Sequence, residues 1–225
     1  MISKPSSDTR SIRDQVYEDL KQQIITLKIL PGTSLSENEM AIQFNVSRTP
    51  VRESFVRLAQ EGLVQVLPQR GTLVSLIDRS LVEEARFMRL QLECAIIEIA
   101  CNDFPGSSLN ELAMNLSKQK AFLEYEDSDH IFTLDQQFHF ILFAGVNKIH
   151  TWHTMSQLTI HLDRSRKLRL LDNNDWKQIY EQHCQIFEAI QKKDATFAIQ
   201  VMKQHLNRGI DDFAMLNQKY PDYFI

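Results

Sequence analysis

Hydrophobic positions in the first 62 residues recur at helical spacing in three groups separated by turn residues. The first group covers 11–27 and is followed by a proline–glycine turn. The second covers 36–44 and opens with serine and glutamate three positions apart, which is a capping-box spacing. The third covers 47–61 and stops at a glycine. This pattern predicts three helices.

Two short apolar segments with strand character follow these helices. Residues 63–66 and 72–75 are rich in valine and leucine, and the Pro-Gln-Arg-Gly segment at 68–71 is typical of a turn. Three helices followed by a β-hairpin predict a winged helix-turn-helix over 11–77. The polar residues 1–10 are expected to form a flexible arm.

The pattern after residue 77 is helical throughout, without strand-like alternation. Apolar residues follow helical spacing in six segments, 81–101, 109–125, 131–143, 149–171, 176–192 and 195–216. Residues 78–225 are therefore expected to form an all-helical bundle of six or seven helices. The predicted fold class is mainly α, a winged helix-turn-helix followed by an all-α bundle.

Composition places the chain among ordinary globular proteins and narrows its setting. Hydrophobic residues make up 43% of the 225 residues and charged residues 24%. We expect no membrane partner, because no apolar stretch approaches the roughly 18 residues of a membrane span. Residues 1–10 lack an apolar signal core, and three cysteines are an odd number. These features predict buried free thiols, not a disulfide framework, and a cytoplasmic location.

Net charge does not by itself indicate nucleic-acid binding, because residues 1–78 carry nine basic and nine acidic residues. Local placement is more informative. Arg48 and Arg52 lie one turn apart at the start of the third predicted helix, which Ser47 would cap. A guanidinium at this end of a recognition helix can pair with the two acceptors of guanine in the major groove. A solvated helix face is the alternative for a lone arginine pair.

The first domain resembles the GntR family of bacterial transcription regulators in three stretches, residues 46–53, 58–63 and 70–74. The resemblance implies that Arg48 and Arg52 read bases and that Ser47 and Thr49 contact phosphate. It also implies a wing tip at Gly71, close to the minor groove, with Arg70 reaching a phosphate. Thr49 as a simple cap and Arg70 as a solvated turn residue are the alternatives. DNA is therefore the expected partner.

The helical half contains a group of residues with metal-ligand chemistry. Asp135 and His139 are four positions apart, so they share one helix face. His183 and His205 lie in later helical segments, and facing helices could bring the four side chains together. Three imidazoles and one carboxylate suit Zn²⁺, Ni²⁺, Mn²⁺ or Fe²⁺. Each histidine taken singly is more often a structural residue than a ligand.

This half resembles the FCD effector-binding domain of the FadR-type branch, whose metal-binding members show an Asp-x-x-x-His followed by two later histidines. The resemblance implies a divalent transition metal, zinc first, on all four residues. It also implies that Arg89, which precedes Glu93 by four residues, faces the effector cavity; a surface ion pair with Glu93 is the alternative. A guanidinium beside a metal would favour a small organic acid as the effector. Further candidate effector contacts are Arg164, Arg166 and Asn147, although Asn147 has helix termination as its main expected role.

Together these features predict a transcriptional regulator, not an enzyme, that acts as a homodimer on a palindromic operator. We expect the protein to repress transcription and a carboxylate metabolite to relieve that repression. Two alternatives remain open: a constitutive DNA-binding protein with a purely structural metal, and a metalloenzyme. The second lacks an identifiable acid or base beside the metal and leaves the winged helix unexplained.

Overall fold

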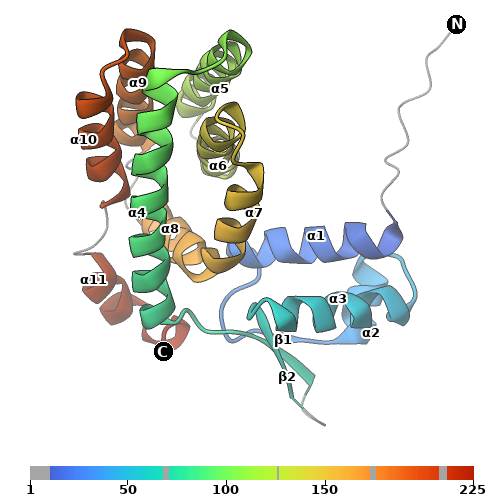
Figure 1. The fold of residues 1–225 in the computed structure, drawn as a ribbon. Helices are drawn as coiled ribbons and strands as arrows, with labels where there is room; N and C mark the ends of the chain where they lie inside the picture. The colour runs from blue at the N-terminus through green and yellow to red at the C-terminus, as the bar shows by residue number, and fades with distance from the viewer. Residues whose placement is uncertain (1–10, 68–70, 126, 173–175, 208–211) are drawn as a thin grey trace, which may run out of the picture. The chain divides into compact units, whose positions relative to one another are not determined.

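The computed structural model describes residues 11–67, 71–125, 127–172, 176–207 and 212–225, drawn as a ribbon in Figure 1. The chain divides into two compact units, residues 1–76 and 77–225. The arm expected at 1–10 and residues 68–70 of the expected turn, with Arg70, lie outside the described residues.

The first unit contains the three predicted helices, α1 (Ile12–Ile25), α2 (Glu37–Gln43) and α3 (Arg48–Gln60). Side chains of Ser11 and Ser36 cap α1 and α2. Ser47 occupies the N-cap position of α3, as expected, but its side chain makes no capping hydrogen bond. Gly62 follows α3 with φ of +75°, a conformation that favours glycine.

The sheet of this unit has three strands where two were predicted: β1 (Ser34–Leu35), β2 (Val64–Leu67) and β3 (Gly71–Val74). The strands are antiparallel in the order β1-β3-β2, and Leu67 pairs with Gly71 at the wing. A two-residue strand such as β1 is too short to show alternation in the sequence.

The second unit is helical in its described residues. Its helices are α4 (Arg79–Asn102), α5 (Gly106–Glu124), α6 (Ser128–Gly145), α7 (Ile149–Leu158), α8 (Ile160–Asp172), α9 (Trp176–Lys192), α10 (Ala195–Leu206) and α11 (Asp212–Lys219), followed by the short 3-10 helix η1 (Pro221–Tyr223). The fold class, mainly α with a winged helix-turn-helix first, is as predicted.

Two predicted helices are each divided in the structure. The segment 149–171 breaks at Thr159, whose hydroxyl oxygen lies within hydrogen-bond distance of Ser156 O, at 3.4 Å, and of Asp163 Oδ2, at 3.2 Å. Such local hydrogen bonds compete with a continuous helix. The segment 195–216 divides into α10 and α11. The apolar periodicity continues across both breaks, which is why it did not reveal them.

The core of the second unit lies among α4, α5, α6, α9 and α10, and α4 and α10 pack side by side (Figure 1). All three cysteines are free, as predicted. Cys101 belongs to this core, whereas Cys94 and Cys184 are only half-buried, so full burial was wrong for these two. Of the helices that the structure describes, none has the length and apolar character that crossing a membrane requires.

Candidate metal centre

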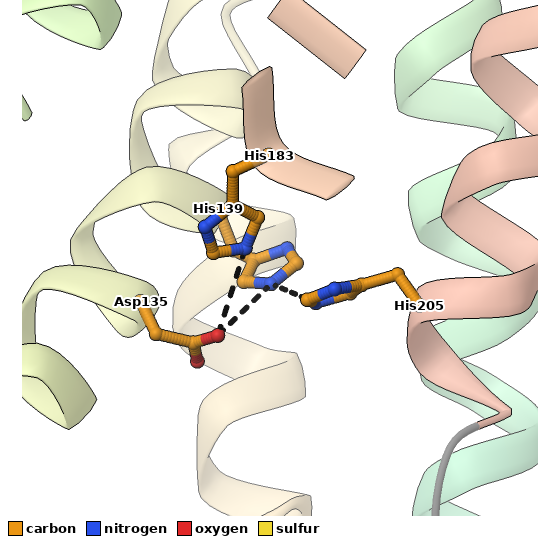
Figure 2. A group of neighbouring side chains, drawn as sticks. All are labelled: Asp135, His139, His183 and His205. Atoms are coloured by element: carbon orange, nitrogen blue, oxygen red, sulfur yellow. Dashed lines mark hydrogen bonds and ion pairs between the residues drawn. The ribbon is translucent and has the colours of Figure 1, made fainter. Parts of the chain in front are cut away.

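The four predicted ligands meet inside the second unit. Asp135 and His139 come from α6, His183 from α9 and His205 from α10, and Figure 2 shows the side chains pointing toward one another. One nitrogen or oxygen from each lies within 4.8 Å of the others, and all four residues are buried. The four-residue spacing on α6 places Asp135 and His139 on the same face, as expected.

A chain of hydrogen bonds fixes which nitrogen of His183 faces the centre. Asn115 Nδ2 donates a hydrogen bond to the Leu134 carbonyl, which can only accept, at 3.0 Å. Asn115 Oδ1 accepts from Gln119 Nε2 at 2.6 Å, and Gln119 Oε1 lies 2.9 Å from His183 Nδ1. The proton is therefore on Nδ1, and Nε2 presents a lone pair. Burial lowers the pKa of His183 to about 3, which keeps the ring neutral at pH 7.

The other two imidazoles have comparable partners. His139 Nδ1 hydrogen-bonds Glu93 Oε2, and Glu93 Oε1 accepts from Arg89 Nε. Burial raises the pKa of Glu93, but Arg89 and then His139 outweigh burial and lower it to about 2. The ionised Glu93 can only accept, so His139 donates through Nδ1. His205 Nδ1 lies 3.3 Å from Gln182 Oε1, and burial lowers the pKa of His205.

The centre therefore brings acceptor atoms together. Asp135 Oδ1 and His183 Nε2 lie 3.6 Å apart, and neither atom has a hydrogen-bond partner among the described residues. His139 Nε2 and His205 Nε2 face each other at 3.1 Å. Buried acceptors without donors are costly unless a cation joins them. Three imidazoles and a carboxylate fit a divalent transition metal, and their outward nitrogens carry the partners that orient metal-binding histidines.

Arg166 of α8 fixes the remaining oxygen of the aspartate. Its Nη2 donates to Asp135 Oδ2 at 2.7 Å, and its Nη1 lies 3.5 Å from Asp163 Oδ1. Burial raises the pKa of Asp135, but Arg166, followed by the nearby imidazoles, outweighs burial and holds the pKa well below its usual range. Asp135 is therefore ionised, with its Oδ1 turned toward the three imidazoles.

A cavity of about 140 Å³ reaches the centre at His205. Arg89 and Arg166, two of the predicted effector contacts, line it. Three further arginines also line it, Arg79, Arg86 and Arg169. Arginine pairs with carboxylates through two parallel hydrogen bonds, and an apolar cavity of about 150 Å³ holds a benzene-sized molecule. The cavity therefore suits a small anion.

The other two predicted effector contacts do not line this cavity. Arg164 is completely buried in α8, and burial lowers its pKa to about 10. Asn147 is exposed after α6 with φ of +59°, and its N–H donates to Ala144 O, so it terminates the helix, which was its main expected role. His161, expected to be structural, accepts the Asp78 N–H at Nδ1.

The predicted DNA contacts lie at the start of α3. Ser47, Arg48, Thr49 and Arg52 are all exposed there, and Gly71 begins β3 with φ of +88°. Both arginines form ion pairs with Glu37 of α2, a residue that the sequence analysis did not single out.

Sequence reasoning also missed Gln119 and Asn115 as partners of the metal centre. A usable signal existed, because these polar residues continue the buried stripe of Leu112 and Leu116 on α5. A polar residue on the apolar face of a helix needs an interior partner. Gln182, the partner of His205, carries the same signal, because it lies in the buried stripe of Ile179 and Ile186 on α9.

Comparisons with known proteins agree with this architecture. Residues 12–74 match the bacterial regulatory proteins of the gntR family, and residues 84–208 match the FCD domain. The HTH-type transcriptional repressor RspR of Escherichia coli (strain K12) is 35% identical over 216 residues, which cover 96% of this chain and 95% of that protein. The gluconate operon transcriptional repressor of Bacillus subtilis (strain 168) is 28% identical, covering 92% of this chain and 84% of that protein.

A solved structure, E. coli McbR/YncC, shares the fold with a TM-score of 0.80 at 23% identity, covering 94% of this chain and all of that one. The two family matches and the 35% identical relative extend over nearly all of the sequence. The metalloenzyme alternative is set aside, since these relatives are regulators. The chain belongs to the GntR family and is a DNA-binding transcriptional regulator with an FCD domain.

Proposed function

We propose that the helical unit holds a divalent transition metal on Asp135, His139, His183 and His205, and that a small carboxylate bound beside it controls DNA binding. The observation that carries this proposal is the meeting of buried acceptor atoms beside an arginine-lined cavity that His205 also lines. Zinc is the first candidate, with nickel, manganese and iron as the others.

The effector class follows from the charges at the cavity wall. A bound metal would attract a carboxylate oxygen as a Lewis acid. Arg89 and Arg166 line the same cavity as His205, so a carboxylate there would meet guanidinium donors beside the centre. The name of the gluconate operon repressor connects one relative with a sugar-acid operon, which is in keeping with an organic acid.

The proposed mode of action is repression by a homodimer on a palindromic operator. One recognition helix reads only a few base pairs, and a two-fold dimer doubles the contacts. Effector binding would change DNA affinity only if the carboxylate binds the two states differently, a coupling typically of about 1–3 kcal/mol. Light scattering of the purified protein, alone and with operator DNA, tests the dimer: a monomer on DNA would contradict it.

Metal content is the first test of the metal site. Elemental mass spectrometry of the wild-type protein, an Asp135→Ala/His183→Ala variant and a control His153→Ala variant at an exposed histidine gives the stoichiometry. We expect near-stoichiometric metal in the wild type and the control, and none in the double variant with its helicity retained. No metal in the wild type after incubation with Zn²⁺ or Ni²⁺ would overturn the site.

The effector requires a separate test on DNA selected from a random library with the wild-type protein. Fluorescence anisotropy should show that some carboxylate in a panel of sugar acids and dicarboxylates releases this DNA from the metal-loaded protein. A purely structural metal would instead be supported if no compound of the panel changed the DNA affinity and if chelation only lowered the melting temperature.

A further inference from the structure

Glu37, in the first turn of α2, binds both arginines expected to read bases. Its Oε1 lies 2.9 Å from Arg52 Nε, and its Oε2 lies 2.9 Å from Arg52 Nη2 and 3.2 Å from Arg48 Nη2. The tight turn between α2 and α3, with Asn45 at φ of +52°, brings the two helix starts together. The arginine side chains are about 60% exposed and that of Glu37 is 26% exposed, so the group faces solvent.

The geometry leaves the reading edge of Arg52 available. A guanidinium has five N–H donors in a rigid fork, and Glu37 takes the edge formed by Nε and Nη2. The end of the fork, formed by Nη1 and the outer N–H of Nη2, is the part that can pair with O6 and N7 of guanine. A carboxylate held on one edge therefore orients the guanidinium without occupying the other.

Charge gives the same contact a second consequence. Two arginines and one glutamate sum to +1, and the hydrogen bonds from Arg52 lower the pKa of Glu37, so the carboxylate stays ionised near pH 7. Phosphate contacts provide sequence-independent affinity, whereas base contacts provide specificity. An anion beside the two arginines weakens their attraction to phosphate at any sequence.

We propose that Glu37 is a positioning residue for DNA readout, which holds Arg48 and Arg52 toward base edges and limits their use as general phosphate binders. The glutamate thereby sets the ratio of specific to non-specific affinity, although it makes no base contact itself.

The test compares Glu37→Gln and Glu37→Asp with Glu39→Gln as a matched control. Glu39 lies in the same first turn and is exposed, and no hydrogen bond joins it to either arginine. Each full-length protein is titrated with DNA selected by the wild type and with a scrambled duplex at several salt concentrations. Melting curves and circular dichroism confirm folding.

We expect Glu37→Gln to lower the ratio of specific to non-specific affinity at least tenfold, with scrambled DNA bound as tightly as by the wild type or more tightly. The salt dependence on scrambled DNA should steepen, because freed arginines engage phosphates. Glu37→Asp should also lower the ratio, since the shorter side chain keeps the charge but not the reach. Glu39→Gln should retain the ratio.

Repeating the selection with each variant identifies the bases involved. Preference should weaken for Glu37→Gln at the positions that Arg48→Ala and Arg52→Ala also lose. The proposal would be overturned if Glu37→Gln kept the wild-type ratio of specific to non-specific affinity, or if Glu39→Gln lowered that ratio as much as Glu37→Gln does. It would also be overturned if Glu37→Asp kept the wild-type ratio. If Glu37→Gln changed the preference only at one cytosine that neither arginine variant affects, Glu37 would be a direct base reader. That result would also overturn the proposal.

Discussion

Gln119 of α5 and His183 of α9 are joined by a 2.9 Å hydrogen bond in the interior of the helical unit. Because the Gln119 amide also donates to Asn115, its oxygen must face the imidazole. This bond therefore decides that His183 Nε2 is the atom turned toward Asp135.

Replacing Gln119 with leucine removes the acceptor that orients His183. We expect the Gln119→Leu variant to bind zinc about 10- to 100-fold more weakly, the usual effect of losing such an outer partner. Competition with a chromophoric chelator measures the affinity. Gln200→Leu, at an exposed position on α10, should bind zinc like the wild type. Equal affinities in the two variants would show that this bond does not tune the site.

Metal binding should also stabilise the fold, because the four ligands come from three helices. With free metal at 100 times its Kd, the free energy of unfolding should rise by about 2.7 kcal/mol. Thermal melting with Zn²⁺ and with a chelator measures the difference. The Asp135→Ala/His183→Ala variant should lose this difference, and a persistent shift there would indicate metal binding elsewhere.

The cavity arginines offer a test of the effector that leaves the metal ligands intact. Arg86 lines the cavity and donates to Asn207 Oδ1 at 3.2 Å. Losing one charge-assisted hydrogen bond to a carboxylate costs about 1.5–3 kcal/mol. The Arg86→Gln variant should therefore bind a carboxylate effector about 10- to 150-fold more weakly than the wild type does. Isothermal titration measures this affinity, with unchanged metal content as the control. Lys203→Gln, exposed on α10, should have no effect.

Sequence reasoning predicted the meeting of Asp135, His139, His183 and His205 better than it predicted their surroundings. Spacing alone puts Asp135 and His139 on one helix face. His183 and His205 were candidates from later helical segments, and the family resemblance favoured them over the other histidines. Helical periodicity can place Gln119 and Gln182 on buried stripes, but it does not say which residues they contact, because that depends on how the helices pack. The break at Thr159 was missed for a related reason, because only side-chain hydrogen bonds mark it.

Gly145, at the end of α6, illustrates a packing constraint on this half. A Cβ added there would lie 2.3 and 2.5 Å from two ring atoms of Phe104. We expect Gly145→Ala to lower the free energy of unfolding by about 1–3 kcal/mol, as overpacking usually does. Gly106→Ala, where nothing lies within 4 Å of the added carbon, should be neutral or slightly stabilising. Denaturant unfolding of both variants measures the contrast.

His161 makes stability depend on pH. Its Nδ1 accepts the Asp78 N–H at 3.0 Å, and burial, followed by Arg164, lowers its pKa from 6.5 to about 4. Between these values the unfolded chain binds a proton at this position and the folded chain does not. The contribution of His161 is therefore fully present above pH 6.5 and is lost as the pH falls toward 4, by about 2 kcal/mol between pH 7.5 and pH 5.

The His161→Asn variant should remove this dependence, because an amide oxygen can accept the same N–H without titrating. Denaturant unfolding of wild type and variant from pH 7.5 to pH 5 measures the change. Buried His183 and His205 titrate in both proteins, so the difference between the two curves isolates His161. We expect that difference to shift by about 2 kcal/mol in favour of the variant at pH 5. Parallel curves would mean that His161 is protonated equally in the folded and unfolded chains.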